Sequence, residues 1–133
     1  MYEVLTYATH SHGKFEGLAS HPHVKVLGWG TEWKGFMDKF NGVLEYIDTV
    51  DDDDVIIFVD GFDSWINGHP ARAVELFKQT NSGLLVSLDT SPYGNLLTKN
   101  IFGTCKDGLI ANSGMYMGYA WCIREVLKSI VVK

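Results

Sequence analysis

The fold of this 133-residue chain is decided by the stretch Val55-Ile56-Ile57-Phe58-Val59-Asp60-Gly61-Phe62-Asp63. Its first five residues are all apolar, which predicts a strand buried on both faces, as strands of a parallel sheet are. The apolar run stops at Asp60, so the polar residues after it are expected at the carboxyl end of the strand. Gly61 favours a tight turn there, because glycine adopts backbone conformations that other residues avoid.

Segments on both sides of this strand predict alternating strands and helices. Further strands are expected at Tyr2–Tyr7, Val24–Leu27 and Leu84–Leu88. Helices are expected at Phe15–Ala19, Met37–Ile47, from Pro70 onward and from Ala120 to the chain end. Residues 92–107 are predicted to be mostly loop, and Asn112-Ser113-Gly114 is predicted to be a turn. The pattern indicates one α/β domain over residues 1–133, with a mainly parallel sheet and flanking helices.

Composition excludes several classes of partner and location. Eleven basic and 16 acidic residues give a net charge of −5, which disfavours nucleic acid as a partner. No apolar run approaches the roughly 20 residues of a membrane span, and the segment Met1–Tyr7 does not resemble a signal peptide. The two cysteines, Cys105 and Cys122, are expected to be free thiols. These features favour a cytoplasmic or viral setting.

The two carboxylates Asp60 and Asp63 are the strongest candidates for chemistry. They lie three residues apart at the end of the predicted buried strand, where ligands of open α/β sheets bind. Carboxylate oxygens are the ligands that Mg²⁺ and Mn²⁺ prefer, although a plain polar turn would have the same spacing. The aromatic residues Trp29, Trp33 and Phe62 could present a flat face to a base or simply fill the core.

Other polar clusters point less clearly to a function. The run Asp51–Asp54 lacks the ligand spacing of a calcium loop, and we interpret it as a solvated loop at the opposite edge of the sheet. The pairs His10/His12 and His21/His23 have no cysteine or carboxylate partner nearby in the sequence. They are therefore interpreted as loop histidines rather than zinc ligands.

Four segments, in order along nearly the whole chain, resemble motifs of one family. Val26–Gly35 resembles a Leu-Gly-x-Gly-x-x-Trp motif, and Ile57–Asp63 resembles Phe-x-Asp-x-Tyr-Asp. Leu85–Asp89 resembles a Phe-Ser-Ala-Glu strand, and Asn112–Ala120 resembles Asn-Ser-Gly-Gly-Phe-x-Gly-x-Ala. The family is the glycosyltransferase domain of the procollagen lysyl hydroxylases.

The resemblance implies a Rossmann-like GT-A fold and a glycosyltransferase that takes a sugar from a UDP-sugar donor. The acceptor would be the hydroxyl of a hydroxylysine or of a glycan. Asp60 and Asp63 would hold Mn²⁺ (or Mg²⁺) against the diphosphate. Nucleotide-binding residues would be Thr6, Ala8, Thr9, Trp33, Lys39 and Phe62. Asn112, Ser113 and Gly114 would line the sugar site, and Asp89 is the candidate catalytic carboxylate.

The chain also departs from the family pattern. Phe62 replaces a tyrosine, Asp89 replaces a glutamate, and the Cys-x-Pro that often follows is absent. The family's acidic cluster and distal histidine would follow Lys133, so the chain is expected to be incomplete at its C-terminus and to bind nucleotide better than it turns it over. Two alternatives stay open: a non-catalytic nucleotide-sugar-binding remnant, and a Mg²⁺-dependent nucleotidyltransferase or phosphohydrolase.

Overall fold

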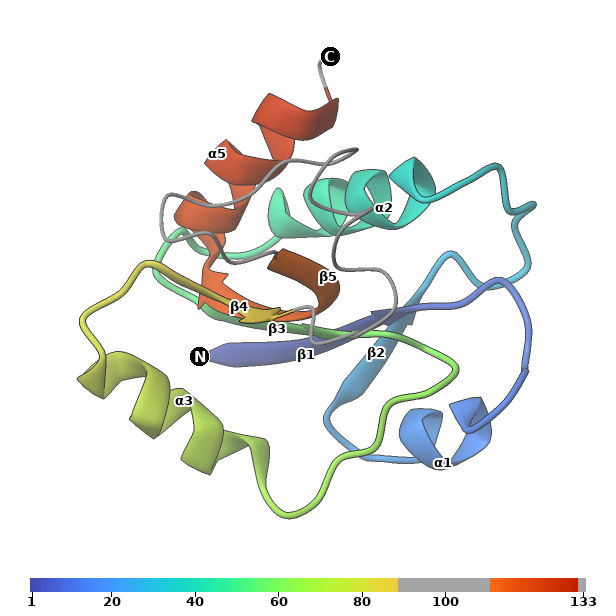
Figure 1. The fold of residues 1–133 in the computed structure, drawn as a ribbon, viewed down its shortest axis with the longest axis horizontal. Helices are drawn as coiled ribbons and strands as arrows, with labels where there is room; N and C mark the ends of the chain where they lie inside the picture. The colour runs from blue at the N-terminus through green and yellow to red at the C-terminus, as the bar shows by residue number, and fades with distance from the viewer. Residues whose placement is uncertain (89–110, 132–133) are drawn as a thin grey trace.

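A computed structural model describes residues 1–88 and 111–131 and contains one five-stranded sheet with helices on both faces (Figure 1). The strands are β1 (Tyr2–Tyr7), β2 (Val24–Leu27), β3 (Val55–Val59), β4 (Leu84–Leu88) and β5 (Ala111–Tyr119). The helices are α1 (Phe15–Ala19), α2 (Met37–Ile47), α3 (Pro70–Gln79) and α5 (Ala120–Val131). No helix in these two ranges is both long enough and apolar enough to span a bilayer.

The strand order is β2-β1-β3-β5-β4, and β1 pairs in parallel with both β2 and β3. Strand β5 is antiparallel to β3 and to β4, so it alone opposes the other four. The predicted α/β class with a mainly parallel sheet is therefore confirmed. The predicted loop over residues 92–107 and the candidate Asp89 lie outside the described residues.

The predicted turn at Asn112-Ser113-Gly114 is wrong, because these residues begin strand β5. Asn112 is paired with Ser87 of β4, and Ala111 with Leu88. The Ser87 hydroxyl also donates to the carbonyl oxygens of Asn112 and Met115, both at 3.0 Å. Pairing with β4 thus overrides the turn preference of Asn112, whereas Ser113 and Gly114 fall at a register shift between Val86 and Ser87 in that pairing.

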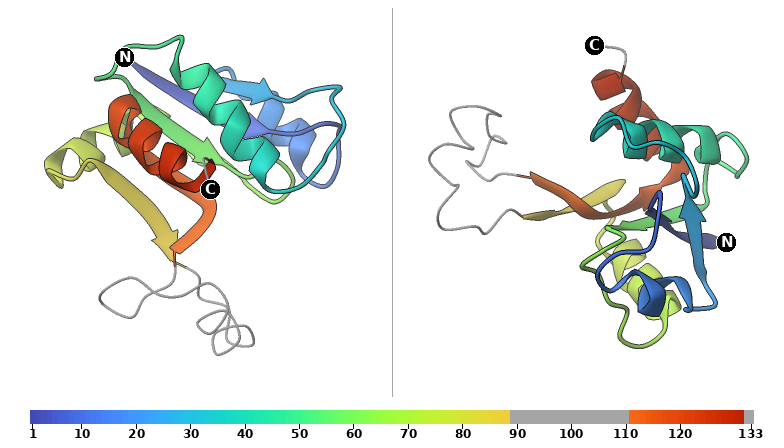
Figure 2. Two further views of the ribbon diagram at one scale, coloured as in Figure 1. Left: turned by 90° about the horizontal axis from the view of Figure 1, so that it is seen from above. Right: turned by 90° about the vertical axis from the view of Figure 1, so that its right-hand side faces the viewer.

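Strand β3 is buried on both faces, as its apolar run predicts. Ile56 and Phe58 pack into a core with α2 and α5, whereas Val55, Ile57 and Val59 pack into a second core with α1 and α3. Figure 2 shows these two helix pairs on opposite sides of the sheet. Side chains of a strand alternate between its faces, so one five-residue segment anchors both layers.

The acidic run Asp51–Asp54 lies before β3, at the edge opposite Asp60, as expected, but it is more than a solvated loop. Asp52 accepts a hydrogen bond of 2.6 Å from Arg124 of α5, and its carbonyl oxygen accepts one from the Trp121 amide. Asp54 lies 3.6 Å from the Met1 amine. The run therefore ties α5 and the N-terminus to the start of the central strand.

Candidate functional site

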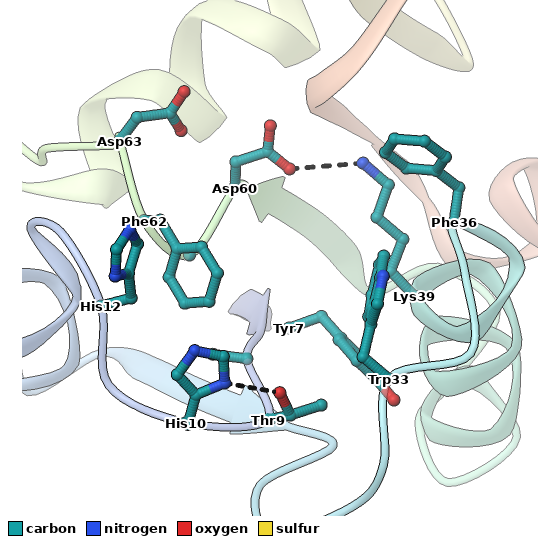
Figure 3. A pocket seen from close by; sticks show the side chains of 12 residues that line it. Tyr7, Thr9, His10, His12, Trp33, Phe36, Lys39, Asp60, Phe62 and Asp63 are labelled. Atoms are coloured by element: carbon teal, nitrogen blue, oxygen red, sulfur yellow. Dashed lines mark hydrogen bonds and ion pairs between the residues drawn. The ribbon is translucent and has the colours of Figure 1, made fainter.

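A cavity of about 520 Å³ opens at the carboxyl ends of β1 and β3 (Figure 3). Its size falls within the range of roughly 300–1,000 Å³ typical of small-molecule sites. Three separate segments line it, and they contribute Tyr7, Ala8, Thr9, His10, His12, Trp33, Phe36, Lys39, Asp60, Gly61, Phe62 and Asp63. The structure thus brings together seven of the predicted site residues, which are Ala8, Thr9, Trp33, Lys39, Asp60, Phe62 and Asp63.

The turn that carries both carboxylates is fixed by its backbone. The Asp60 amide donates to the carbonyl oxygen of Gly114 at 2.9 Å, which joins the turn to β5. Gly61 is buried, and a Cβ there would lie 2.8 Å from the Tyr7 carbonyl oxygen. Its φ is not positive, so the glycine is needed for close approach to β1 rather than for the unusual turn conformation that the sequence suggested.

The two carboxylates are the candidate ligands for a hard divalent cation. Both extend to the same side of the turn, away from Phe62 (Figure 3), and the Asp60 side chain is 39% exposed. A Cβ at Gly114 would come within 2.7 Å of Asp60 Oδ2, so a glycine there leaves room for that oxygen. The described residues form no cluster of three or more His, Cys, Asp or Glu that could hold a metal. Two carboxylates completed by water and phosphate oxygens are the usual arrangement for Mg²⁺.

Lys39 places a positive charge against this carboxylate pair. Lys39 belongs to the first turn of α2, and its Nζ lies 3.3 Å from Asp60 Oδ1. The residue is only 8% exposed. Nζ also lies 5.7–5.8 Å from the ring centroids of Phe36, Phe40 and Phe58, within the distance of cation–π attraction. The ammonium group is therefore held at Asp60 by several contacts.

Aromatic side chains form the wall next to α2. The Trp33 ring lies 5.9 Å from the Tyr7 ring and 6.1 Å, edge to face, from the Phe36 ring. Trp33 remains 47% exposed, so its side chain does not simply fill the core. Its exposed face is available to a planar ligand.

The other wall contains two histidines that the sequence interpretation left without a function. His10 and His12 lie 5.4 and 5.2 Å from the Phe62 ring, and His10 Nδ1 is 2.9 Å from the Thr9 hydroxyl oxygen. They line the cavity because the loop after β1 lies beside the Asp60–Asp63 turn. Their position after the first strand was the clue available in the sequence.

The other predicted site residues that the structure describes, Thr6 and residues 112–114, do not line this cavity. Thr6 is fully buried, and its hydroxyl donates to the Val59 carbonyl oxygen at 2.7 Å, so it joins β1 to the end of β3. Asn112 Oδ1 accepts a hydrogen bond from the Gly114 amide at 2.7 Å. Ser113 lines a separate apolar cavity of about 220 Å³. On β5, Gly114 is bonded through its carbonyl oxygen to the Asp60 amide, so this strand borders the site without lining the main cavity.

Tyr116 of β5 carries a buried hydroxyl close to the same site. Its ring stacks on Phe58, with centroids 5.0 Å apart, and its hydroxyl has no hydrogen-bond partner within the described structure. Burial, and to a lesser extent the negative charge of Asp60, raises the pKa of Tyr116. The neutral phenol is therefore favoured in the folded protein.

Replacing Tyr116 with phenylalanine is expected to stabilise the protein by about 1 kcal/mol at neutral pH, because it removes an unpaired buried hydroxyl. The pKa of Tyr116 is higher in the folded protein than in the unfolded chain. Above about pH 10 an unfolded tyrosine loses its proton while the folded one keeps it, and this lowers the free energy of unfolding of the wild type. The advantage of Tyr116→Phe should therefore grow between pH 8 and pH 11, as measured by urea unfolding. The partly exposed Tyr2→Phe is the control, and a pH-independent difference would contradict the argument.

Comparison with known protein families adds independent information. The family model of the PLOD GT domain matches residues 2–133, which is nearly the whole chain. A comparison with curated proteins gave no match. The family match agrees with the four sequence motifs and with the observed α/β sheet. The chain therefore belongs to the PLOD GT domain family, the glycosyltransferase domain of procollagen lysyl hydroxylases.

Proposed function

We propose that this protein is a metal-dependent glycosyltransferase that binds a UDP-sugar and transfers the sugar to the hydroxyl of a hydroxylysine or a glycan. Family membership supports glycosyl transfer in general. The observation that carries the proposal is that one cavity combines Asp60 and Asp63 with the buried cation of Lys39 and the exposed ring of Trp33. These groups match the metal, diphosphate and base of such a donor.

In this proposal Asp60 and Asp63 hold Mn²⁺ (or Mg²⁺) and need only be ionised to do so. A cation held by these carboxylates would offset the negative charge that develops on the leaving diphosphate. Lys39 adds a second positive charge beside Asp60, 3.3 Å from its Oδ1. Asp89, which follows β4 in the sequence, is the carboxylate proposed to activate the acceptor hydroxyl.

The uridine is proposed to lie between the two aromatic walls, against Trp33 and Phe62 and beside Ala8 and Thr9. Phe62 lacks a hydroxyl, so it would contribute stacking alone. The sugar would then extend towards the first residues of β5, residues 112–114, because the Gly114 carbonyl oxygen is bonded to the Asp60 amide. This orientation places the bond to be broken next to the carboxylates.

The proposal is tested by calorimetric titration with UDP, UDP-glucose, UDP-galactose and GDP, each with and without Mn²⁺. Selective, Mn²⁺-dependent binding of the uridine compounds is expected. Release of UDP in the presence of a hydroxylysyl peptide then measures transfer. Equal affinity for GDP and UDP, or a UDP affinity that is the same with and without Mn²⁺, would contradict the assignment of the donor.

Replacing Trp33 with alanine is expected to weaken UDP binding by about 1–3 kcal/mol, the range for stacking of one base on an aromatic ring. The control is Trp65→Ala, which removes a more exposed tryptophan (63%) that does not line this cavity. UDP should also change the indole fluorescence of the wild type and of the Trp65 variant. Unaltered UDP affinity in the Trp33 variant would show that its ring serves only packing.

A further inference from the structure

We infer that Lys39 acts as a built-in counter-cation for Asp60, so that a divalent metal alone binds weakly and the nucleotide diphosphate is needed to bring the metal in. This inference rests on the proposed function, and it adds an order of binding to it. Its basis is the contact between Lys39 Nζ and Asp60 Oδ1 at 3.3 Å.

The ammonium group is a fixed part of the site rather than a passing surface contact. Lys39 is 8% exposed although lysine is almost never fully buried without a partner. Its stem belongs to helix α2, and the rings of Phe36, Phe40 and Phe58 surround Nζ. These contacts favour a position of the charge beside Asp60, so it acts on the carboxylates before a ligand binds.

The charges at this site determine whether the metal and the nucleotide strengthen or weaken each other's binding. Asp60 Oδ1 faces Lys39, whereas Oδ2 lies beside Gly114 of β5, so a metal on Asp60 would share one carboxylate with the ammonium group. Two cations on one carboxylate repel each other, and because the Asp60 side chain is 39% exposed, water weakens this repulsion without removing it. A diphosphate attracts both cations and offsets their repulsion. Such coupling is reciprocal, so each ligand strengthens the binding of the other.

The experiment compares Lys39→Met with the wild type and with the control Lys34→Met, which removes an exposed lysine outside the cavity. Free Mn²⁺ is quantified by electron paramagnetic resonance without nucleotide, and UDP binding without metal is measured by calorimetry. Lys39→Met should bind Mn²⁺ alone about 5- to 150-fold more tightly, the usual size of coupling between ligands, and UDP alone more weakly. Lys34→Met should change neither, and Lys39→Arg should keep the weak binding of metal alone.

The outcomes separate the two proposals. If the wild type binds Mn²⁺ with UDP but Lys39→Met gains no affinity for Mn²⁺ alone, the inference is overturned and the proposed function stands. If the wild type binds neither Mn²⁺ nor UDP, both are overturned. Lys39→Gln, which keeps a hydrogen-bond donor for Asp60, provides the same comparison if the methionine variant does not fold.

Discussion

Replacing Asp60 with asparagine is expected to abolish the Mn²⁺ dependence of UDP binding. The substitution removes the charge of one of the two carboxylates on the turn after β3, and Asp63 alone is a poor cation site. The loss of metal affinity should be about 100-fold or more, because groups that only orient metal ligands already contribute about 10- to 100-fold. Calorimetric titration of UDP with and without Mn²⁺ measures the effect directly.

The matched control for this substitution is Asp53→Asn. Asp53 is an exposed carboxylate before β3, at the opposite edge of the sheet, so its loss should leave UDP binding and its metal dependence as they are. Asp60 is partly exposed, and the Asp60 variant should therefore keep its circular dichroism spectrum. A folded Asp60 variant with wild-type UDP affinity and wild-type Mn²⁺ dependence would refute the metal assignment.

Replacing Phe58 with alanine is expected to destabilise the fold by about 3–5 kcal/mol, the usual cost of removing a buried phenylalanine ring. Phe58 is 1% exposed, and its ring stacks on Tyr116 in the core beneath α2 and α5. A loss of this size is a large part of the total stability of about 5–15 kcal/mol that a typical protein has. Urea unfolding at constant pH measures it.

The control for the core substitution is Leu76→Ala on α3. Leu76 is 47% exposed, so removing its side chain should change the free energy of unfolding by less than about 1 kcal/mol, as most surface substitutions do. If Phe58→Ala were as mild as this control, the sheet would not be held to α2 and α5 through the stacked pair Phe58–Tyr116.

Most strands and helices could be predicted because their patterns are local. The bounds of β3 and α2 match the predicted ranges Val55–Val59 and Met37–Ile47, since an uninterrupted apolar run and a helical spacing of apolar residues are each contained within one element. Pro70 begins α3 as expected, because proline suits the first helical turn. The position of Asp60 at the strand end followed from the same reasoning.

Features that depend on distant pairing could not be predicted in this way. Asn112 begins a strand because it pairs with Ser87 of β4, whereas Ser113 and Gly114 lie at a register shift in that pairing. The contact between Lys39 and Asp60 joins residues 21 positions apart and depends on how α2 packs over the sheet. The close approach of Gly61 to Tyr7 likewise requires the parallel pairing of β1 and β3.

The reversed direction of β5 has a consequence for how this domain can diversify. Leu88 ends β4 and Ala111 begins β5, and the two are paired in register, so the chain leaves and re-enters the sheet at one place. That place lies on the edge where Gly114 is bonded to Asp60. The β4–β5 pairing therefore does not itself fix how many residues separate Leu88 from Ala111. A change in that number would alter the chain beside the site without changing the order of the strands in the sheet.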